Sequence, residues 1–265
     1  MPEGDAVRRT ADRLDRALAG QTLTGTDFRV PQLATTDLAG ATVERTATHG
    51  KHLLTRLTTP GGERLTLHTH LKMEGSWRTA ALGERRPGPA ADARVVLETD
   101  RVVAVGLRLG LVELVATAEE DAIVGHLGPD LLGPWTEGDR AEAVARLTAR
   151  PDRVLGEALL DQTVVAGIGT IWLAESCFVQ GVCPVGPVSA VRDPARFLDR
   201  ARQMLQSAMR TGRPVTTGDR RNPVWAYRRH RQPCLRCRTP LVSGEVGSPG
   251  RERSTYWCPR CQPVR

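Results

Sequence analysis

The chain is poor in lysine and has no long apolar run. Of its 37 lysine and arginine residues, only Lys51 and Lys72 are lysines, so arginine carries nearly all of the positive charge. No stretch approaches the roughly 18 consecutive apolar residues that a membrane-spanning helix needs, and no apolar signal region follows the N-terminus. We therefore expect a soluble protein with no membrane span and no secretion signal.

Cysteine is also scarce, and four of the six cysteines stand near the C-terminus. They form two Cys-x2-Cys pairs with twenty residues between them: Cys234, Cys237, Cys258 and Cys261. Four thiolates satisfy a tetrahedral Zn²⁺ and leave no open coordination position. A redox Cys-x-x-Cys is the weaker alternative, because two matched pairs occur without a thioredoxin-like βαβ pattern. The sequence predicts one structural zinc, with Cys177 and Cys183 as buried free thiols in a reducing compartment.

The charge is unbalanced toward positive. The net charge is +7 and the sequence pI is near 9.6. These values favour an acidic partner, with nucleic acid first and an anionic membrane surface second. Arginines stand around the cysteine pairs beside Tyr256 and Trp257, and such a surface suits phosphate binding. Most of these arginines taken singly also fit a solvated basic rim.

The hydrophobic pattern changes twice along the chain. Residues 5–18 have the spacing of an amphipathic helix, and residues 22–114 form short runs of Thr, Val and Leu broken by Gly and Pro, as in a β-sandwich or barrel. Beyond residue 118 the spacing is helical, and residues 211–221 lead to the cysteine pairs. The helical segments are 119–127, 137–148, 154–160, 170–179 and 194–210. We expect an α+β, multidomain fold with domains at residues 1–118, 119–221 and 222–265.

The N-terminus carries a proline directly before a carboxylate. If the initiator methionine is removed, Pro2 presents a free secondary amine, which can attack an electrophilic carbon and form a Schiff base. An α-amino group has a pKa near 7.7–8.0, against about 10.4 for lysine, so far more of it is unprotonated at neutral pH. The plainer interpretation of Pro2-Glu3 is an ordinary helix entry, and the residues alone favour it.

A Gly-x-Gly element precedes one of the predicted helices. Gly167-x-Gly169 opens onto a helix at Thr170, which suits binding of a phosphate by backbone N–H groups and the helix dipole. The same pattern also serves helix–helix packing. A dinucleotide-binding fold does not fit, because the third glycine and the βαβ unit are missing.

Five motifs resemble, in the same order, those of the formamidopyrimidine-DNA glycosylase/endonuclease VIII family. They are Pro2-Glu3-Gly4, Gly50-Lys51, Leu127-Gly128-Pro129-Asp130, Asp161-Gln162-x4-Gly167-x-Gly169 and the four-cysteine finger. The resemblance covers the whole chain and implies a bifunctional DNA glycosylase that excises oxidised bases and cuts the backbone. The implied fold is an N-terminal helix plus a two-sheet β-sandwich, a helix–two-turn–helix domain and a C-terminal zinc-finger β-hairpin.

The resemblance implies roles for three residues in catalysis. Pro2 is expected to attack C1′ of the damaged nucleotide and displace the base, which leaves an iminium. Glu3 is expected to be the general acid/base that moves protons during ring opening. Lys51 is expected to bind the phosphate next to the lesion. Imine formation acidifies C2′, so β-elimination and then δ-elimination are expected to follow.

Further DNA contacts are implied. Met73 stands where the family places the wedge that fills the space left by an extruded base, whereas the plainer interpretation is a core methionine. Lys72 is a weaker candidate next to it. Gly169 and Thr170 are expected to contact phosphate, and Arg253 matches the phosphate-binding arginine of the finger. His68 and His70 lack an evident third metal ligand, so we interpret them as structural strand residues.

Two departures from the family pattern bear on specificity. Thr170 stands where the family usually has Asn, so weaker or altered DNA contact is expected there. Leu107-Arg108-Leu109-Gly110 replaces the Arg-Arg-Phe-Gly run with which the purine-lesion branch reads the opposite cytosine. This difference favours the endonuclease VIII branch and oxidised pyrimidines.

The expected partner is double-stranded DNA with oxidised bases or abasic sites. We expect a monomer by family likeness, located in the cytoplasm with the nucleoid. Two alternatives stay open: a purine-lesion glycosylase of the same family, and a non-catalytic DNA-binding protein on the same scaffold. The joint presence of Pro2, Glu3 and Lys51 argues against the second.

Overall fold

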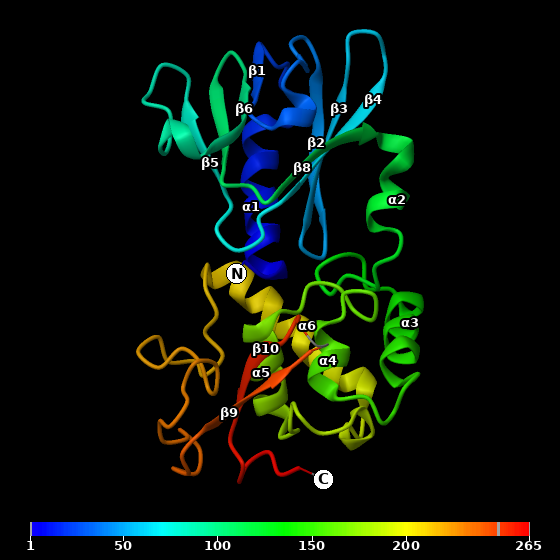
Figure 1. Cartoon of the computed structure of the whole chain (residues 1–265), viewed down its shortest axis with the longest axis vertical. Coiled ribbons are helices and arrows are strands. Elements are labelled where there is room, and N and C mark those ends of the chain that lie inside the picture. The colour runs from blue at the N-terminus through cyan, green and yellow to red at the C-terminus, as the bar shows by residue number, and fades with distance from the viewer. Residues whose placement is uncertain (1, 248–249, 265) are drawn as a thin grey trace. The chain divides into compact units, whose positions relative to one another are not determined.

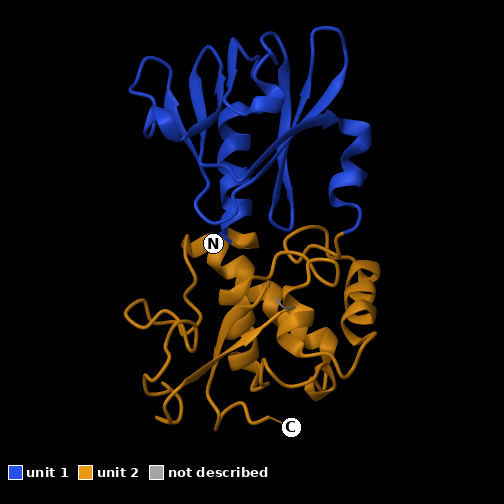
Figure 2. Cartoon of the chain, viewed as in Figure 1, with its two compact units in different colours: residues 1–2, 6–126 blue, residues 3–5, 127–265 orange. Residues whose placement is uncertain are grey.

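The computed structural model describes residues 2–247 and 250–264 and divides into two compact units. Figure 2 shows them in blue and orange. Unit 1 comprises residues 1–2 and 6–126, and unit 2 comprises residues 3–5 and 127–265. Within the described residues, no helix is both long and apolar enough to cross a membrane. The domain boundaries expected after residues 118 and 221 remain a prediction.

Unit 1 is built from one long helix and two antiparallel sheets (Figure 1). Each sheet has four strands, in the orders β2-β3-β4-β8 and β1-β6-β7-β5. The helices are α1 (Gly4–Leu18) and α2 (Glu120–Val124). The strands are β1 (Gly25–Phe28), β2 (Thr42–His49), β3 (His52–Thr58), β4 (Arg64–His70), β5 (Ser76–Ala81), β6 (Ala93–Glu98), β7 (Val102–Leu107) and β8 (Leu111–Ala116).

One apolar face of α1 joins the two sheets into a single core. Val7, Ala11, Leu14 and Leu18 are almost fully buried, as their helical spacing predicts. Alternate residues of the strands from both sheets complete this core, and Trp77 of β5 is its largest member. The predicted helix and two-sheet β-sandwich are therefore confirmed.

Unit 2 is helical apart from its last segment. Its helices are α3 (Glu137–Thr148), α4 (Leu155–Leu160), α5 (Thr170–Gln180) and α6 (Pro194–Thr211). Local signals fix their ends: Thr136 and Asp139 form a capping box on α3, and Gly212 ends α6 in the left-handed conformation. The helices bury one apolar core, in which Trp172 of α5 is fully buried. The predicted helical segments are confirmed within a few residues, although α2 is shorter than expected.

The chain ends in an antiparallel hairpin, β9 (Val242–Val246) and β10 (Arg253–Trp257). A small apolar cluster joins this end of unit 2 to α5. Ala174 and Phe178 of α5 pack with Ala226, Leu241 and the cysteine segment. Phe178 also stacks on Trp225, with the ring centroids 5.2 Å apart. Helix α5 therefore supports the hairpin region directly.

Candidate active site and metal centre

Glu3 lies at the N-terminus of α5, although 166 residues separate it from Gly169 in the sequence. Its carboxylate is buried, with an exposed fraction of 2%. Three backbone N–H groups donate to it: those of Gly169 at 3.0 Å, Ile171 at 2.7 Å and Trp172 at 3.2 Å. The partial positive charge of a helix N-terminus favours an ionised carboxylate there. We call this arrangement the Glu3 cradle.

Three glycines make the Glu3 cradle sterically possible. A Cβ atom on Gly169 would lie 2.4 Å from Cδ of Glu3, so only glycine fits there. A Cβ atom on Gly4 would lie 2.9 Å from the Cα and the O atoms of Gly167, to which the Gly4 N–H donates at 3.0 Å. Gly167 itself has a φ of +105°. The Pro-Glu-Gly and Gly-x-Gly motifs are therefore two sides of one close contact.

The sequence predicts that the Gly-x-Gly element binds a phosphate of a partner. The structure shows that the N–H groups of Gly169, Ile171 and Trp172 donate to a carboxylate of the chain itself. DNA contact at Gly169 and Thr170 stays a prediction. Thr170 is the first residue of α5, where its side chain is half-buried.

The remaining polar residues of this motif shape the loop before α5. Gln162 donates to the carbonyls of Leu160 and Ile168 and accepts from the Gly167 N–H. Asp161 accepts from the backbone and hydroxyl of Thr163 and pairs with Arg153 at 3.0 Å. These bonds fold residues 161–169 back on themselves, so the Asp-Gln pair serves to place the glycines.

A second carboxylate ties the start of α1 to α5. Asp5 is buried and accepts from the indole Nε1 of Trp172 at 2.8 Å. Trp172 is fully buried in the core of unit 2. Two anchors therefore hold the N-terminal residues, the carboxylate of Glu3 and that of Asp5.

Lys51 lies in the tight turn between β2 and β3. His49 and His52 pair across the two strands and leave Gly50 and Lys51 as the turn residues. Gly50 has a φ of +56°, which explains the glycine. Lys51 is buried, with an exposed fraction of 7%, which is unusual for a lysine. Pro2, the expected nucleophile, is half-buried in the same unit.

Met73 stands on an exposed turn after β4. Its side chain is 65% exposed, so the interpretation as a core methionine is wrong. The turn closes through the bond from the Gly75 N–H to the Leu71 carbonyl at 2.8 Å. Lys72 is exposed as well and has a φ of 50°. An exposed apolar side chain on a tight, hydrogen-bonded turn is suited to enter a base stack as a wedge. Contact of Met73 with DNA stays a prediction.

The segment that departs from the family pattern lies next to this turn. The Gly110 N–H donates to the His70 carbonyl at 3.0 Å, and a Cβ atom on Gly110 would lie 2.2 Å from Cγ of Lys72. Arg108 pairs with Asp92 at 2.9 Å and with Glu74 at 3.4 Å. Its guanidinium lowers the pKa of the Asp92 carboxyl. Arg108 therefore connects the Met73 turn to the loop before β6.

Three histidines and a glutamate form a polar strip on sheet β2-β3-β4-β8. Nδ1 of His52 lies 2.8 Å from Nε2 of His68, and Nδ1 of His68 lies 3.0 Å from Oε2 of Glu113. The Lys72 N–H donates to Nδ1 of His70 at 2.8 Å. Burial is the main cause that lowers the pKa of His52 to about 3 and that of His70 to about 4. His52 and Glu113 were missed from the sequence, because only the strand register brings them beside His68.

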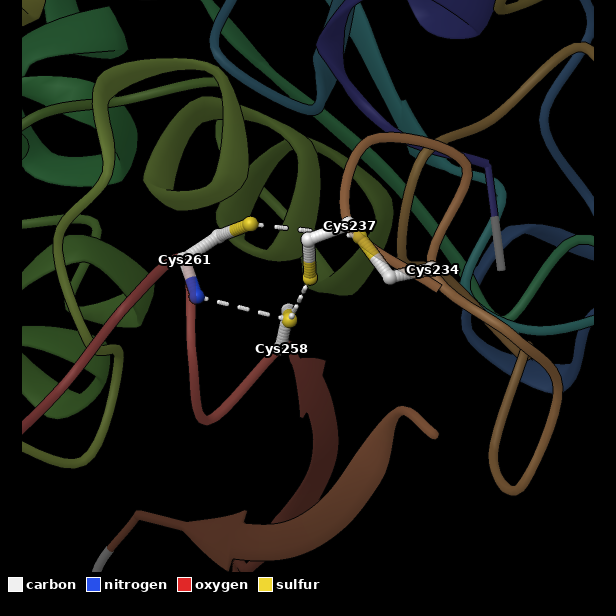
Figure 3. A group of neighbouring side chains, drawn as sticks. All are labelled: Cys234, Cys237, Cys258 and Cys261. Atoms are coloured by element: carbon white, nitrogen blue, oxygen red, sulfur yellow. Dashed lines mark hydrogen bonds between the residues drawn. The ribbon is translucent and has the colours of Figure 1, made fainter. Parts of the chain in front are cut away.

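The four predicted zinc ligands come together at the end of unit 2 (Figure 3). Their sulfur atoms all lie within 4.8 Å of one another, with Cys237 and Cys258 at 3.4 Å and Cys234 and Cys261 at 4.0 Å. Sulfurs that share a tetrahedral Zn²⁺ are about 3.8 Å apart, from a Zn–S length near 2.3 Å. In the part of the chain that the structure describes, no other three or more acidic, histidine or cysteine side chains gather this closely. The donor set fits one structural zinc.

Glu175 is a buried acid that the sequence did not single out. It lies in the middle of α5 with no exposed surface, and it accepts from the N–H groups of Ala226 at 2.8 Å and Tyr227 at 2.9 Å. Its second oxygen accepts from the Trp225 N–H at 2.8 Å and from the Thr216 hydroxyl. The one sequence signal that could have identified Glu175 is its position as an acid inside an otherwise apolar helix. Through the Glu175 carboxylate, α5 holds the segment that leads to the zinc site.

Arg253 is the first residue of β10 and is exposed on the hairpin that carries Cys258 at its end. It pairs with Val246 across the hairpin. The predicted position in the last strand is therefore confirmed, whereas phosphate binding by its side chain stays a prediction.

Sequence comparison identifies two family models and several relatives. Residues 1–111 match the formamidopyrimidine-DNA glycosylase N-terminal domain, and residues 231–264 match the zinc finger found in FPG and IleRS. The chain is 50% identical to "Probable endonuclease 8 2" of Streptomyces coelicolor, over 99% of this chain and 94% of that protein. It is 44% identical to "DNA-(apurinic or apyrimidinic site) lyase Nei2" of Mycolicibacterium smegmatis, over 99% of both chains.

Solved structures share the fold. The Lactococcus lactis Fpg (MutM) in complex with DNA containing N7-benzyl-Fapy-dG superposes with a TM-score of 0.79 at 23% identity, over 99% of this chain and 100% of that one. The same enzyme in complex with abasic-site DNA superposes equally well, at 22% identity. Together with relatives that match over nearly its whole length, these findings show that the chain belongs to the formamidopyrimidine-DNA glycosylase/endonuclease VIII family.

Proposed function

We propose that the protein is a bifunctional DNA glycosylase and AP lyase of base excision repair, which acts through a Schiff base on Pro2. The observation that carries the proposal is the Glu3 cradle, which holds a carboxylate in one position directly after the nucleophile. A general acid/base has to be held in place to act on a bound substrate. A scaffold that only bound DNA would not require a buried carboxylate at this point.

The reaction starts when the unprotonated nitrogen of Pro2 forms a bond to C1′ of the damaged nucleotide. As this bond forms, the Pro2 nitrogen loses its proton to the ionised carboxylate of Glu3, and the C1′–base bond breaks while the departing base takes a proton from water. Glu3 then passes its proton to O4′ as the sugar ring opens, and an iminium forms between Pro2 and C1′. Loss of a proton from C2′ then expels the 3′ phosphate, and δ-elimination expels the 5′ phosphate. Hydrolysis of the imine returns Pro2.

Residues from both units bind the duplex in this proposal. Lys51 binds a phosphate beside the lesion, with Lys72 nearby, and Met73 fills the space of the extruded base. Thr170 of unit 2 and Arg253 of the zinc hairpin bind further phosphates, and Gly169, whose N–H is donated to Glu3, contacts the DNA only through the close approach of its backbone. The partner is double-stranded DNA with an oxidised base or an abasic site, bound by a monomer. The zinc holds the hairpin in shape and takes no part in the chemistry.

The substrate class that we propose is oxidised pyrimidines. Arg108, in the segment that replaces Arg-Arg-Phe-Gly, is already paired with Asp92 and Glu74. The relatives named "Probable endonuclease 8 2" and "DNA-(apurinic or apyrimidinic site) lyase Nei2" are 50% and 44% identical to the chain. An "Endonuclease 8" of Klebsiella pneumoniae at 30% and a "Formamidopyrimidine-DNA glycosylase" of Cereibacter sphaeroides at 31% are equally distant, so the support comes from the endonuclease 8 2 and Nei2 relatives. The same enzyme family also includes purine-lesion glycosylases, and activity on 8-oxoguanine paired with cytosine distinguishes that second function.

Borohydride trapping tests the proposal. The protein with Met1 removed is mixed with duplexes that carry one abasic site, one thymine glycol or one 8-oxoguanine opposite cytosine, and imines are reduced to stable adducts. We expect adducts with the first two duplexes and their loss in Pro2→Gly. An adduct with the abasic site alone moves the base specificity elsewhere. No adduct from folded, zinc-loaded protein contradicts the enzyme and favours the DNA-binding alternative.

A further inference from the structure

A chain of three hydrogen-bonding side chains crosses the sheet β2-β3-β4-β8 of unit 1. It runs from Glu113 of β8 through His68 of β4 to His52 of β3, with contacts of 3.0 Å and 2.8 Å. His68 is buried, with an exposed fraction of 1%, whereas the Glu113 side chain is 45% exposed. His52 is half-buried and directly follows Lys51 in the sequence. The chain of contacts therefore links solvent at β8 to the Lys51 turn.

The hydrogen-bond partners determine the tautomers of both imidazoles. An ionised carboxylate only accepts, so Nδ1 of His68 carries the hydrogen that is donated to Glu113. Nε2 of a neutral His68 is then an acceptor, and Nδ1 of His52 donates to it. Nε2 of His52 is left without a hydrogen. In the neutral state the strip therefore ends in a basic nitrogen next to the Lys51 turn.

Other basic groups lie around the His52 imidazole. Lys72, His49, His68 and His70 all lower the pKa of His52, after burial as the largest cause. Lys72 and Lys51 lower the pKa of His70 in the same way. The two lysines of the chain thus lie at one cluster of imidazoles, and Glu113 is the carboxylate that faces it, through His68. Burial is the main reason that the imidazoles are neutral, and an anion bound at this cluster would offset both that cost and the repulsion between the basic groups.

We propose that the Glu113–His68–His52 chain is a proton-linked phosphodiester subsite at the Lys51 turn, which takes up one proton when DNA binds. A phosphate oxygen is an acceptor and gains no bond from an unprotonated Nε2, but it accepts from a protonated one. The proton adds to Nε2 of His52. The hydrogen on Nδ1 of His52 can then shift to Nε2 of His68, where the carboxylate of Glu113 balances the positive charge.

The inference rests on the proposed function, because it assumes that DNA approaches the Lys51 turn. The probe is a duplex with a tetrahydrofuran residue as the abasic site, which forms no imine. Calorimetric titrations of the full zinc-loaded protein in pairs of buffers of different ionisation enthalpy, from pH 7 down to pH 5, give the number of protons taken up. We expect uptake that rises toward one as the pH is lowered, because the pKa of His52 is about 3 in the free protein and a bound phosphate raises it. Affinity then rises by up to about tenfold for each pH unit lowered.

Three variants assign the proton. His52→Asn removes the accepting nitrogen and should abolish the uptake. Glu113→Gln keeps an acceptor oxygen but removes the balancing charge, so the uptake should fall and shift to lower pH. His126→Asn, an exposed histidine at the end of unit 1, is the matched control and should behave as the wild type. Uptake that is absent from the wild type, or unchanged in His52→Asn, overturns the inference.

A measurement without DNA covers the case in which a variant fails to fold. Imidazole ¹⁵N shifts of the wild-type protein should show the hydrogen on Nδ1 of both His52 and His68, and a hydrogen on Nε2 of His52 in the free protein contradicts the subsite. Trapping on abasic DNA without proton uptake overturns this inference alone. Absence of both trapping and binding overturns the proposed function, and the subsite with it.

Discussion

The Glu3 cradle and the Lys51–Met73 region are organised in opposite ways. In unit 2, Glu3 is 2% exposed and accepts three backbone hydrogen bonds. Position 169 has room only for glycine, because a Cβ atom there would clash with the Glu3 side chain. In unit 1, Met73 is 65% exposed and stands on a turn beside Lys72 and the paired Arg108. The first region is held by backbone atoms and close packing, and the second by ion pairs and short turns.

This difference follows from what each region has to do: the Glu3 cradle has to hold a catalytic group in place, and the Lys51–Met73 region has to contact DNA. A proton-transferring group has to be placed within a fraction of an ångström, which backbone donors and glycine contacts achieve. A residue that replaces a base in the stack moves from water into contact with the neighbouring bases when DNA binds. Its side chain must therefore be exposed in the free protein. Substitutions in the Glu3 cradle should therefore lower the rate of base excision on every substrate. Substitutions around Met73 should lower excision from duplex DNA more than cleavage of single-stranded DNA.

The largest effect is expected for Glu3→Gln. The amide keeps the shape but cannot serve as a proton donor and acceptor of the same strength, and it directs two hydrogens at backbone N–H groups. Base excision should fall by about 10²–10⁴-fold, the usual contribution of general acid–base catalysis. Single-turnover release of the damaged base measures it. Equal excision by the variant would mean that another acid is used.

A second test moves the carboxylate instead of changing it. Gly169→Ala places a methyl group 2.4 Å from Cδ of Glu3 and should push that side chain off the helix N-terminus. Excision should fall by about 100-fold, as expected for misplacement by an ångström. Gly138→Ala in α3, where the added Cβ lies 3.6 Å from its nearest neighbour, is the control and should keep full activity. Full activity of Gly169→Ala would separate the cradle from catalysis.

Removing one zinc ligand tests the hairpin region. Cys258→Ser should lower the zinc content from one per chain to none, because three thiolates hold the metal far less tightly. DNA affinity should fall about tenfold or more with the loss of the hairpin's phosphate contacts. Metal analysis and a DNA titration measure the two effects. Cys183→Ser, outside the cluster, should keep its zinc, and unchanged affinity of metal-free Cys258→Ser would contradict the assigned role.

The smallest effect is expected for Met73→Ala. An exposed side chain contributes little to stability, so the free energy of unfolding should change by less than about 0.5 kcal/mol. Excision from duplex DNA should fall severalfold, because the space of the extruded base is no longer filled. Cleavage of single-stranded DNA should not change. Leu82→Ala, another exposed apolar residue, is the control, and an equal loss in both variants would argue against a wedge at Met73.

The sequence predicted those parts that depend on local spacing. Helical periodicity placed α3 at residues 137–148, where the structure has it, and the two Cys-x2-Cys pairs placed the four cysteines in one metal site. Both follow from rules that act over a few residues or from a ligand count. The interpretation of Met73 as a core residue failed, because apolarity does not distinguish a buried side chain from an exposed tip.

The histidine strip and Glu175 lie beyond such rules. His52 meets His68 only through the register of β3 on β4, and Glu113 joins them only through β4 on β8. Glu175 looks like a polar interruption of α5 until the segment at residues 216–227 folds over it. Strand register and loop packing depend on the whole core, so no short window of sequence contains them.

By itself the sequence determined the zinc site, the order of the elements and the Pro-Glu-Gly start, since residue type and spacing suffice for each. Only the tertiary structure decided where the Gly-x-Gly helix directs its N–H groups. They meet Glu3, which the chain brings back across 166 residues, and this contact exists only because Gly4, Gly167 and Gly169 let two backbone segments approach more closely than side chains allow. A buried carboxylate needs donors, and in this fold the start of α5 supplies them.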